Sequence, residues 1–253
     1  MDIKGIPLIL PETPSVKLLD LLAQSYYCAI LMFLATMAAL VISIIHYRRH
    51  RNLRIFTCYI ALSLLQDLST TYVIYSDAPL WNFWVVLMIT LTIAFVLFGF
   101  IACNLFILHY IGSPLKRRII WINGLLYFGI LIFAAAKTYF RLSEMFLAVL
   151  ESIFLVPPCL VYFYELFSTV NLQPLKSLPA FWVVTGILFL NACAIPLYLT
   201  VEYLGSYTQV SYTLNYILFS AFFILLIRAY LCPSENPGVR SKSSHGNGGK
   251  RTY

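Results

Sequence analysis

Charged residues are scarce in this chain of 253 residues, where Lys, Arg, Asp and Glu together make up 11% of the sequence. A soluble fold covers its surface with a larger share, about 25% of its residues. Hydrophobic residues make up 61% of the chain, and the mean hydropathy is +0.84. The composition therefore excludes a soluble globular domain and a disordered chain, and it places the protein in a lipid bilayer.

The sequence also lacks the motifs that carry most enzymatic and cofactor chemistry. It contains no G-x-S-x-G, P-loop or GxGxxG motif, which disfavours hydrolases of that kind and nucleotide-binding folds. The last apolar stretch has no lysine for a retinal Schiff base, and the apolar stretches hold too few histidines for a zinc hydrolase. No cysteine pair has the spacing of zinc ligands, and no cysteine lies in an expected outer loop. We therefore expect no metal, no cofactor and no enzymatic activity.

Seven apolar stretches are long enough to cross a bilayer, because about 20 helical residues span roughly 30 Å of hydrocarbon. Short segments with turn-forming residues separate them, for example Gly112-Ser113-Pro114. The second stretch is one of the weaker predictions, because Gln66 and Asp67 interrupt it. The sequence predicts an all-α, polytopic integral membrane protein, a seven-transmembrane helix bundle with spans over residues 21–47, 55–75, 81–110, 119–137, 144–168, 178–200 and 211–231.

Basic residues alternate between the connections, and 13 of the 17 Lys and Arg residues fall on one side. Short basic loops stay in the cytoplasm, so the N-terminus is predicted outside and the C-terminus inside. We expect an extracytoplasmic segment over residues 1–20, the bundle over 21–231 and a disordered basic cytoplasmic tail over 232–253. The net charge of +7 reflects this bias and attraction to anionic lipids, so we expect no nucleic-acid partner.

Two carboxyl groups lie deep in predicted spans, where a charged residue costs about 2.5 to 3.5 kcal/mol on insertion scales. Asp67 interrupts the second span, and Glu151 lies in the outer half of the fifth. Tyr59, Ser63, Asp67 and either Thr70 or Thr71 recur at helical spacing, so one face of the second span is polar. These positions favour an outward-opening polar pocket in which Asp67, Glu151, Ser63 and Thr70 contact a ligand.

Other polar residues and prolines extend this predicted site. Asn191 in the sixth span and Asn215 in the seventh are its further ligand-binding candidates. Pro157-Pro158 removes two backbone donors in the fifth span, so we expect a bend or break that serves as a hinge, with freed carbonyls that need a partner. Asparagine and hydroxyl side chains also act as interhelical glue in membrane bundles, and each polar residue has that alternative role.

The segment over residues 151–199 carries a distinctive set of features. It combines Glu151 and Pro157-Pro158 with the runs Tyr162-Phe163-Tyr164-Glu165, Pro174-Leu175-Lys176 and Pro179-Ala180-Phe181-Trp182. In these features it resembles small uncharacterised seven-span bacterial membrane proteins. The resemblance implies a multi-pass protein of the bacterial inner membrane, with no assigned activity. The expected topology is also similar in shape to heptahelical receptors, although topology alone does not set function.

Three functions remain open from the sequence. The first is a receptor-like or sensory protein that binds a small molecule or lipid in the outer pocket and signals to a cytoplasmic partner. The second is a proton-coupled carrier, which needs a polar path leading inward, for which Glu165, Asn104 and His109 are the candidates. The third is a structural or assembly subunit. The inner halves of several spans are rich in Phe, Leu and Ile, which favours the receptor.

Overall fold

The computed structural model describes residues 15–75, 83–137, 144–168, 175–204 and 208–233, with side chains described over 26–72, 83–137, 146–168, 175–199 and 213–233. Within these ranges the regular structure is entirely helical, as the composition predicts. Two short 3-10 turns, Arg51–Leu53 and Leu175–Ser177, precede α2 and α6. The long helices are α1 (Ser15–Ile45), α2 (Arg54–Tyr75), α3 (Phe83–Tyr110), α4 (Pro114–Lys137), α5 (Glu144–Ser168), α6 (Pro179–Leu204) and α7 (Thr208–Leu231).

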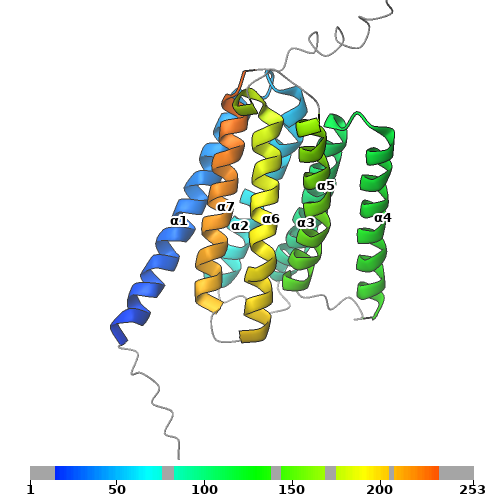
Figure 1. Cartoon of the computed structure of the whole chain (residues 1–253). Helices are drawn as coiled ribbons and strands as arrows, with labels where there is room; N and C mark the ends of the chain where they lie inside the picture. Colours follow the sequence, from blue (N-terminus) through cyan, green and yellow to red (C-terminus); the bar gives the residue numbers. More distant parts are fainter. Residues whose placement is uncertain (1–14, 76–82, 138–143, 169–174, 205–207, 234–253) are drawn as a thin grey trace, which may run out of the picture.

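Six of the seven helices close into a ring. Around it, α1 packs against α2, α2 against α3, α3 against α5, α5 against α6, α6 against α7, and α7 against α1. The remaining helix, α4, stands outside this ring beside α5 and α3 (Figure 1). Within α4 only Ile120 and Tyr127 are buried, so most of its apolar side chains face outward. The interior of the ring is therefore where side chains from α2, α3, α5, α6 and α7 meet.

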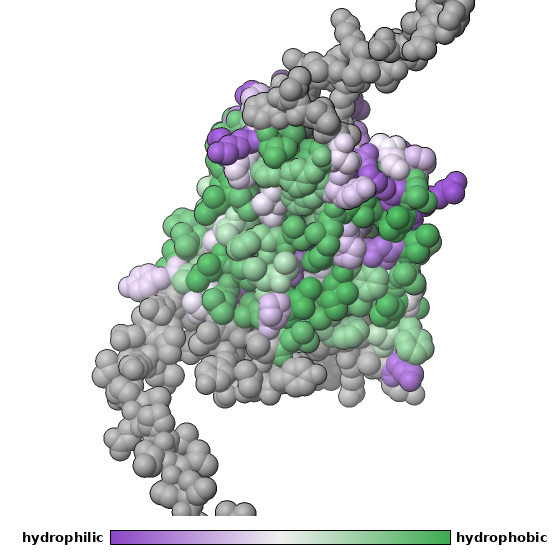
Figure 2. Space-filling view, viewed as in Figure 1, coloured by the Kyte–Doolittle hydropathy of each residue, from purple (hydrophilic) through white to green (hydrophobic). Residues whose placement is uncertain are grey.

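Six helices in the described residues are long and apolar enough to cross a membrane, namely α1, α3, α4, α5, α6 and α7. Their outward sides carry large apolar side chains, and Figure 2 shows a hydrophobic surface over the middle of the bundle. This is a multi-pass membrane protein whose helices contact lipid. The helix α2 is not among the six, because Gln66 and Asp67 fall within it. That α2 crosses the bilayer as well stays a prediction.

Basic side chains gather at one end of the bundle, which we call the basic end. Consecutive helices alternate in direction, so the α1–α2 and α3–α4 connections, the start of α6 and the end of α7 lie together there (Figure 1). Hydrophilic residues appear at this end in Figure 2. The described Lys and Arg residues of this end are Arg48, Arg49, Arg51, Arg54, Lys116, Arg117, Arg118, Lys176 and Arg228.

The two prolines of α5 do not interrupt the helix, which runs on from Glu144 to Ser168. Pro158 has no N–H to donate to the carbonyl of Phe154, four residues earlier. Asn123 of α4 donates from Nδ2 to that carbonyl oxygen at 2.7 Å. The freed backbone acceptor is thus satisfied from a neighbouring helix, as prolines in membrane helices require. The same bond holds the peripheral α4 against the ring.

Two predictions, that α2 crosses the bilayer and that the basic end is cytoplasmic, are tested by labelling single cysteines with a membrane-impermeant maleimide. The native cysteines of the chain are first replaced. If α2 spans, Asp77→Cys after α2 is labelled on intact cells, whereas Arg49→Cys before α2 is labelled only after permeabilisation. Ser113→Cys, in the α3–α4 connection, serves as the reference for the basic end and should behave like Arg49→Cys. Labelling of Asp77→Cys and Arg49→Cys from the same side would show that α2 does not cross.

The Asn123–Phe154 bond is tested by a double-mutant cycle measured as thermal unfolding in detergent. Asn123→Leu leaves the Phe154 carbonyl without its side-chain donor, and we expect a loss of about 1 kcal/mol. Pro158→Ala restores the backbone N–H that faces the same carbonyl. In the Pro158→Ala background, Asn123→Leu should therefore cost less than in the wild type. Equal costs in both backgrounds would contradict this account of the bond.

Candidate functional site

Asp67 faces the interior of the bundle and not the lipid. It shares one face of α2 with Tyr59 and Ser63, both of which are buried. The opposite face of α2 carries exposed side chains, including Leu65 and Leu68. Asp67 itself is half-buried, and its Oδ2 has no hydrogen-bond partner among the described residues. A carboxyl group that faces the bundle interior without a partner is a candidate for binding a ligand or taking up a proton.

Glu151 also faces inward, on the stripe of α5 that contains the buried residues Leu147, Leu155 and Pro158. Its carboxyl lies against Gly99 of α3, where a Cβ atom would stand 3.2 Å from Glu151 Oε1. The same Cβ would stand 2.9 Å from Cε2 of the Tyr59 ring, a distance that real Cβ atoms essentially never show. Only glycine therefore lets α3 approach both side chains so closely.

Tyr59 of α2 lies against Gly99 of α3, as Glu151 does, and Asp67 follows it by eight residues on the same helix. Its ring stacks on Phe95 with centroids 4.8 Å apart and meets Phe222 of α7 edge-on at 6.1 Å. The ionisable groups that act electrostatically on its phenol include Glu151 and Asp67. Among the side chains that the structure describes, no hydrogen bond or ion pair joins Asp67 to Glu151 directly. The two carboxyls are thus not partners of each other.

Tyr127 brings a second phenol from α4 to the same region. Its ring stacks on Phe100 of α3 at 3.7 Å between centroids, and the side chain is 0% exposed. The hydroxyl has no hydrogen-bond partner among the described residues, and Glu151 acts on it electrostatically. A buried hydroxyl without a partner is costly and uncommon in native structures. We refer to Tyr59, Asp67, Gly99, Tyr127 and Glu151 as the carboxyl cluster.

The other predicted ligand residues lie on α2, α6 and α7. Ser63 is buried on the Asp67 face of α2, and Thr70 is half-buried further along that helix. Asn215 of α7 accepts a hydrogen bond at 3.0 Å from the hydroxyl of Tyr198 in α6, and Tyr198 acts electrostatically on Tyr59. This hydrogen bond joins α6 to α7. Asn191 is buried, and its Nδ2 donates to the Ile187 carbonyl of its own helix at 2.7 Å.

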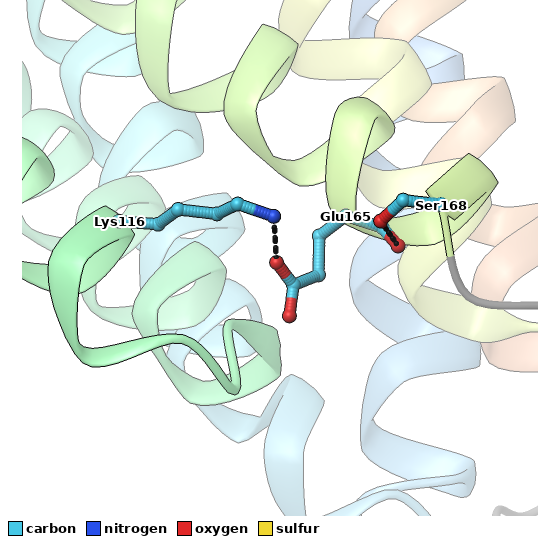
Figure 3. A network of polar contacts seen from close by, with 3 residues as sticks. All are labelled: Lys116, Glu165 and Ser168. Carbon is cyan, nitrogen blue, oxygen red and sulfur yellow. Dashed lines mark hydrogen bonds and ion pairs between the residues drawn. The ribbon is translucent and has the colours of Figure 1, made fainter.

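The residues considered as a path toward the basic end have other contacts. Figure 3 shows that Lys116 extends from the start of α4 to the carboxylate of Glu165 near the end of α5, and the two form an ion pair. Asn104 is buried, and its Nδ2 donates to the carbonyl of Phe100 in its own helix at 2.9 Å. His109 lies on the exposed side of α3. Asn104 Oδ1 is buried and has no hydrogen-bond partner among the described residues.

Three residues of this region were not identified as site residues from the sequence: Gly99, Tyr127 and Tyr198. Gly99 is the only glycine in α3, and a lone glycine in an apolar membrane helix marks a close approach of another helix. Tyr127 lies in the middle of α4, whereas interfacial tyrosines lie near helix ends. These two signals could have identified both residues. Nothing in the sequence indicates that Tyr198 contacts Asn215.

Known proteins give no further guide to this site. Comparison of the chain with known protein families, curated proteins and solved structures found no match. Within the described parts of the chain, no group of three or more His, Cys, Asp or Glu residues could hold a metal ion.

The close approach at Gly99 is tested by substitution with alanine. Gly99→Ala places a Cβ against the Tyr59 ring, which cannot shift readily because Phe95 and Phe222 pack on it. Gly129→Ala in α4 is the matched control, since a Cβ there meets nothing within 4 Å and both substitutions gain the same helix propensity. We expect Gly99→Ala to be less stable than Gly129→Ala by about 1 to 3 kcal/mol in thermal unfolding. Equal stability would contradict the packing described at α3.

Proposed function

We propose that this multi-pass membrane protein is receptor-like or sensory. A small molecule or lipid enters from the end opposite the basic end and meets Asp67 and Glu151, with Ser63, Thr70, Asn191 and Asn215 as further contacts. The basic end, on the cytoplasmic side, reports the binding to a cytoplasmic partner. The observation that carries the proposal is that both carboxyls lie on buried faces of their helices and so face the interior of the bundle.

Apolar packing between the carboxyl cluster and the basic end supports a receptor over a carrier. Phe56 of α2 meets Phe106 of α3 edge-on, with ring centroids 5.1 Å apart, and both side chains are at most 3% exposed. A carrier requires a polar path through this level, because an ion or proton in hydrocarbon has no partner. Buried apolar residues of the same half include Ile60, Ile107, Val183, Ile187, Phe223 and Leu226.

A set of contacts gives the binding region a physical connection to the basic end. Asn215 and Tyr230 lie on the same helix, α7, near its opposite ends. The Tyr230 hydroxyl donates to the Leu53 carbonyl at 2.8 Å and lies 3.0 Å from Thr57 Oγ1, which ties α7 to the start of α2. A rigid-body shift of α7 on ligand binding would therefore move the α1–α2 connection, a recognised form of switching. The prolines of α5 are the proposed hinge.

His50, in the α1–α2 connection, also packs against Tyr230 where α7 meets the start of α2. His50 is 5% exposed and packs edge-on to the Tyr230 ring, with centroids 6.3 Å apart. Burial, and then the positive charges of Arg49 and His46, lower the pKa of His50 from its ordinary value. His50 is therefore neutral at neutral pH, and the charges that a cytoplasmic partner would meet here come from the surrounding arginines.

A proton-coupled carrier is the alternative function. Its supporting observation is that Asp67 Oδ2 has no partner among the described residues, so the carboxyl is free to take up a proton. A purely structural role is the third alternative, and we also propose that the protein has no enzymatic activity. If the role is structural, replacing either carboxyl with a neutral amide should have no functional effect.

The proposal is tested by a thermal-shift screen of small molecules and lipids on the full chain in nanodiscs. Ligands that raise the unfolding temperature of the wild type should lose that effect in Asp67→Asn and Glu151→Gln, because each removes one charged contact while keeping the side-chain shape. Glu165→Gln is the matched control, since Glu165 pairs with Lys116 at the basic end, and it should keep the ligand effect.

Two outcomes would overturn the receptor assignment. Retention of every ligand effect in both Asp67→Asn and Glu151→Gln would leave only an interhelical role for the carboxyls. Alternatively, a ligand found in the screen could be transported into proteoliposomes by the wild type and not by these variants. That result would make the protein a carrier.

A further inference from the structure

Two arginines of the α1–α2 connection lie beside the carboxyl end of α7. His50 packs edge-on to Tyr230 of α7, with ring centroids 6.3 Å apart, and the Tyr230 hydroxyl donates to the carbonyl of Leu53 at 2.8 Å. His50 is buried, whereas its neighbours in sequence, Arg49 and Arg51, are exposed. The contacts of His50 and Leu53 therefore fix both arginines at the end of α7, with their side chains on the surface.

Two further cations reach the same place from the start of α6 and from α7 itself. The carbonyl of Lys176 accepts a hydrogen bond from Trp182 Nε1 at 2.9 Å and another from Cys232 Sγ at 3.7 Å. The guanidinium carbon of Arg228 lies 5.7 Å from the centroid of the Trp182 ring. The side chains of Lys176 and Arg228 are both exposed. We refer to Arg49, Arg51, Lys176 and Arg228 as the α7 junction.

The acidic groups that the structure describes do not balance the charge of the α7 junction. Within the described ranges, the acidic residue at the basic end is Glu165, and it pairs with Lys116 of α4. No ion pair among the described side chains includes a cation of the α7 junction. Residues 234–253, which follow in the sequence, contain one acidic and four basic residues, so their net charge is also positive. A positive surface of this kind attracts anionic groups.

The surroundings of the α7 junction favour a lipid as the source of the anion. Trp at the end of a membrane helix lies at the level of the lipid headgroups, so Arg228, over the Trp182 ring, is at that level too. Ile45 at the end of α1 and Leu231 at the end of α7 are 69% and 50% exposed, and α1 packs against α7. A phospholipid offers an anionic phosphate for the cations and acyl chains for these apolar side chains. A free phosphate or an acidic protein surface would use the cations alone.

We propose that the α7 junction binds the headgroup phosphate of an anionic phospholipid, whose acyl chains lie against the exposed apolar ends of α1 and α7. This inference does not depend on the proposed receptor function. It assigns a lipid to the place where the α1–α2 connection, α6 and α7 meet.

The test titrates the full chain in a neutral detergent with phosphatidylglycerol, which is anionic, and with phosphatidylcholine, which has no net charge. Glycerol 1-phosphate represents the free headgroup phosphate. The unfolding temperature is followed, and the midpoint of each titration gives an apparent affinity. We expect phosphatidylglycerol to stabilise the protein at lower concentration than phosphatidylcholine, and glycerol 1-phosphate to have no effect. Added salt should weaken the stabilisation, because it screens exposed charges.

Paired substitutions then locate the site. Arg49→Gln combined with Arg51→Gln should weaken phosphatidylglycerol binding roughly 10- to 30-fold, since each basic residue near an anionic lipid surface contributes about five-fold. Lys176→Gln combined with Arg228→Gln is a second pair with the same expected result. The matched control is Arg117→Gln combined with Arg118→Gln, which removes equal charge from the start of α4 and should weaken binding less than about five-fold.

Four outcomes would overturn the proposal. Equal losses in the junction pairs and the control pair would show attraction to the total charge of the basic end without a site. Equal stabilisation by phosphatidylcholine would exclude a role for the anionic headgroup. Stabilisation by glycerol 1-phosphate alone would make this a site for soluble phosphates. Absence of any effect of phosphatidylglycerol would leave the cations of the α7 junction to an acidic surface of a cytoplasmic protein.

Discussion

A carboxyl group within a lipid bilayer must face something other than acyl chains, and this constraint organises the bundle. Glu151 faces α3 because Gly99 leaves room for it there, and Asp67 lies on the buried face of α2. Tyr59 approaches the same glycine as Glu151 does and meets α7 through Phe222. The ring of six helices is therefore built around polar groups on one level and around aromatic packing nearer the basic end.

The peripheral helix α4 illustrates how a local defect becomes a tertiary contact. Pro158 frees the carbonyl of Phe154, and Asn123 of α4 donates to it at 2.7 Å. One turn further along α4, Tyr127 stacks on Phe100 and reaches the surroundings of Glu151. The proline thus contributes indirectly to the site, because the hydrogen bond that it makes possible fixes the helix that carries the second phenol.

Composition predicts the class of protein, and the length of the apolar stretches together with the turn residues between them predicts the number of helices. The interior position of Asp67 follows from its spacing with Tyr59 and Ser63, which fixes the shared helix face. Helical spacing cannot reveal which helices are neighbours, so the closed ring, the peripheral position of α4 and the Tyr198–Asn215 bond were not predictable. The prolines predict a freed carbonyl, but the partner residue depends on tertiary packing.

The central claim is that both carboxyls face a shared polar interior that small polar molecules can reach. Cysteine accessibility tests it most directly, in a chain whose native cysteines are replaced, by the rate of reaction with a small water-soluble methanethiosulfonate. Glu151→Cys and Asp67→Cys should react readily, whereas Ile153→Cys and Leu68→Cys, on exposed apolar faces of the same helices, should react far more slowly. Unreactive cysteines at 151 and 67, or equal rates at all four positions, would contradict the account.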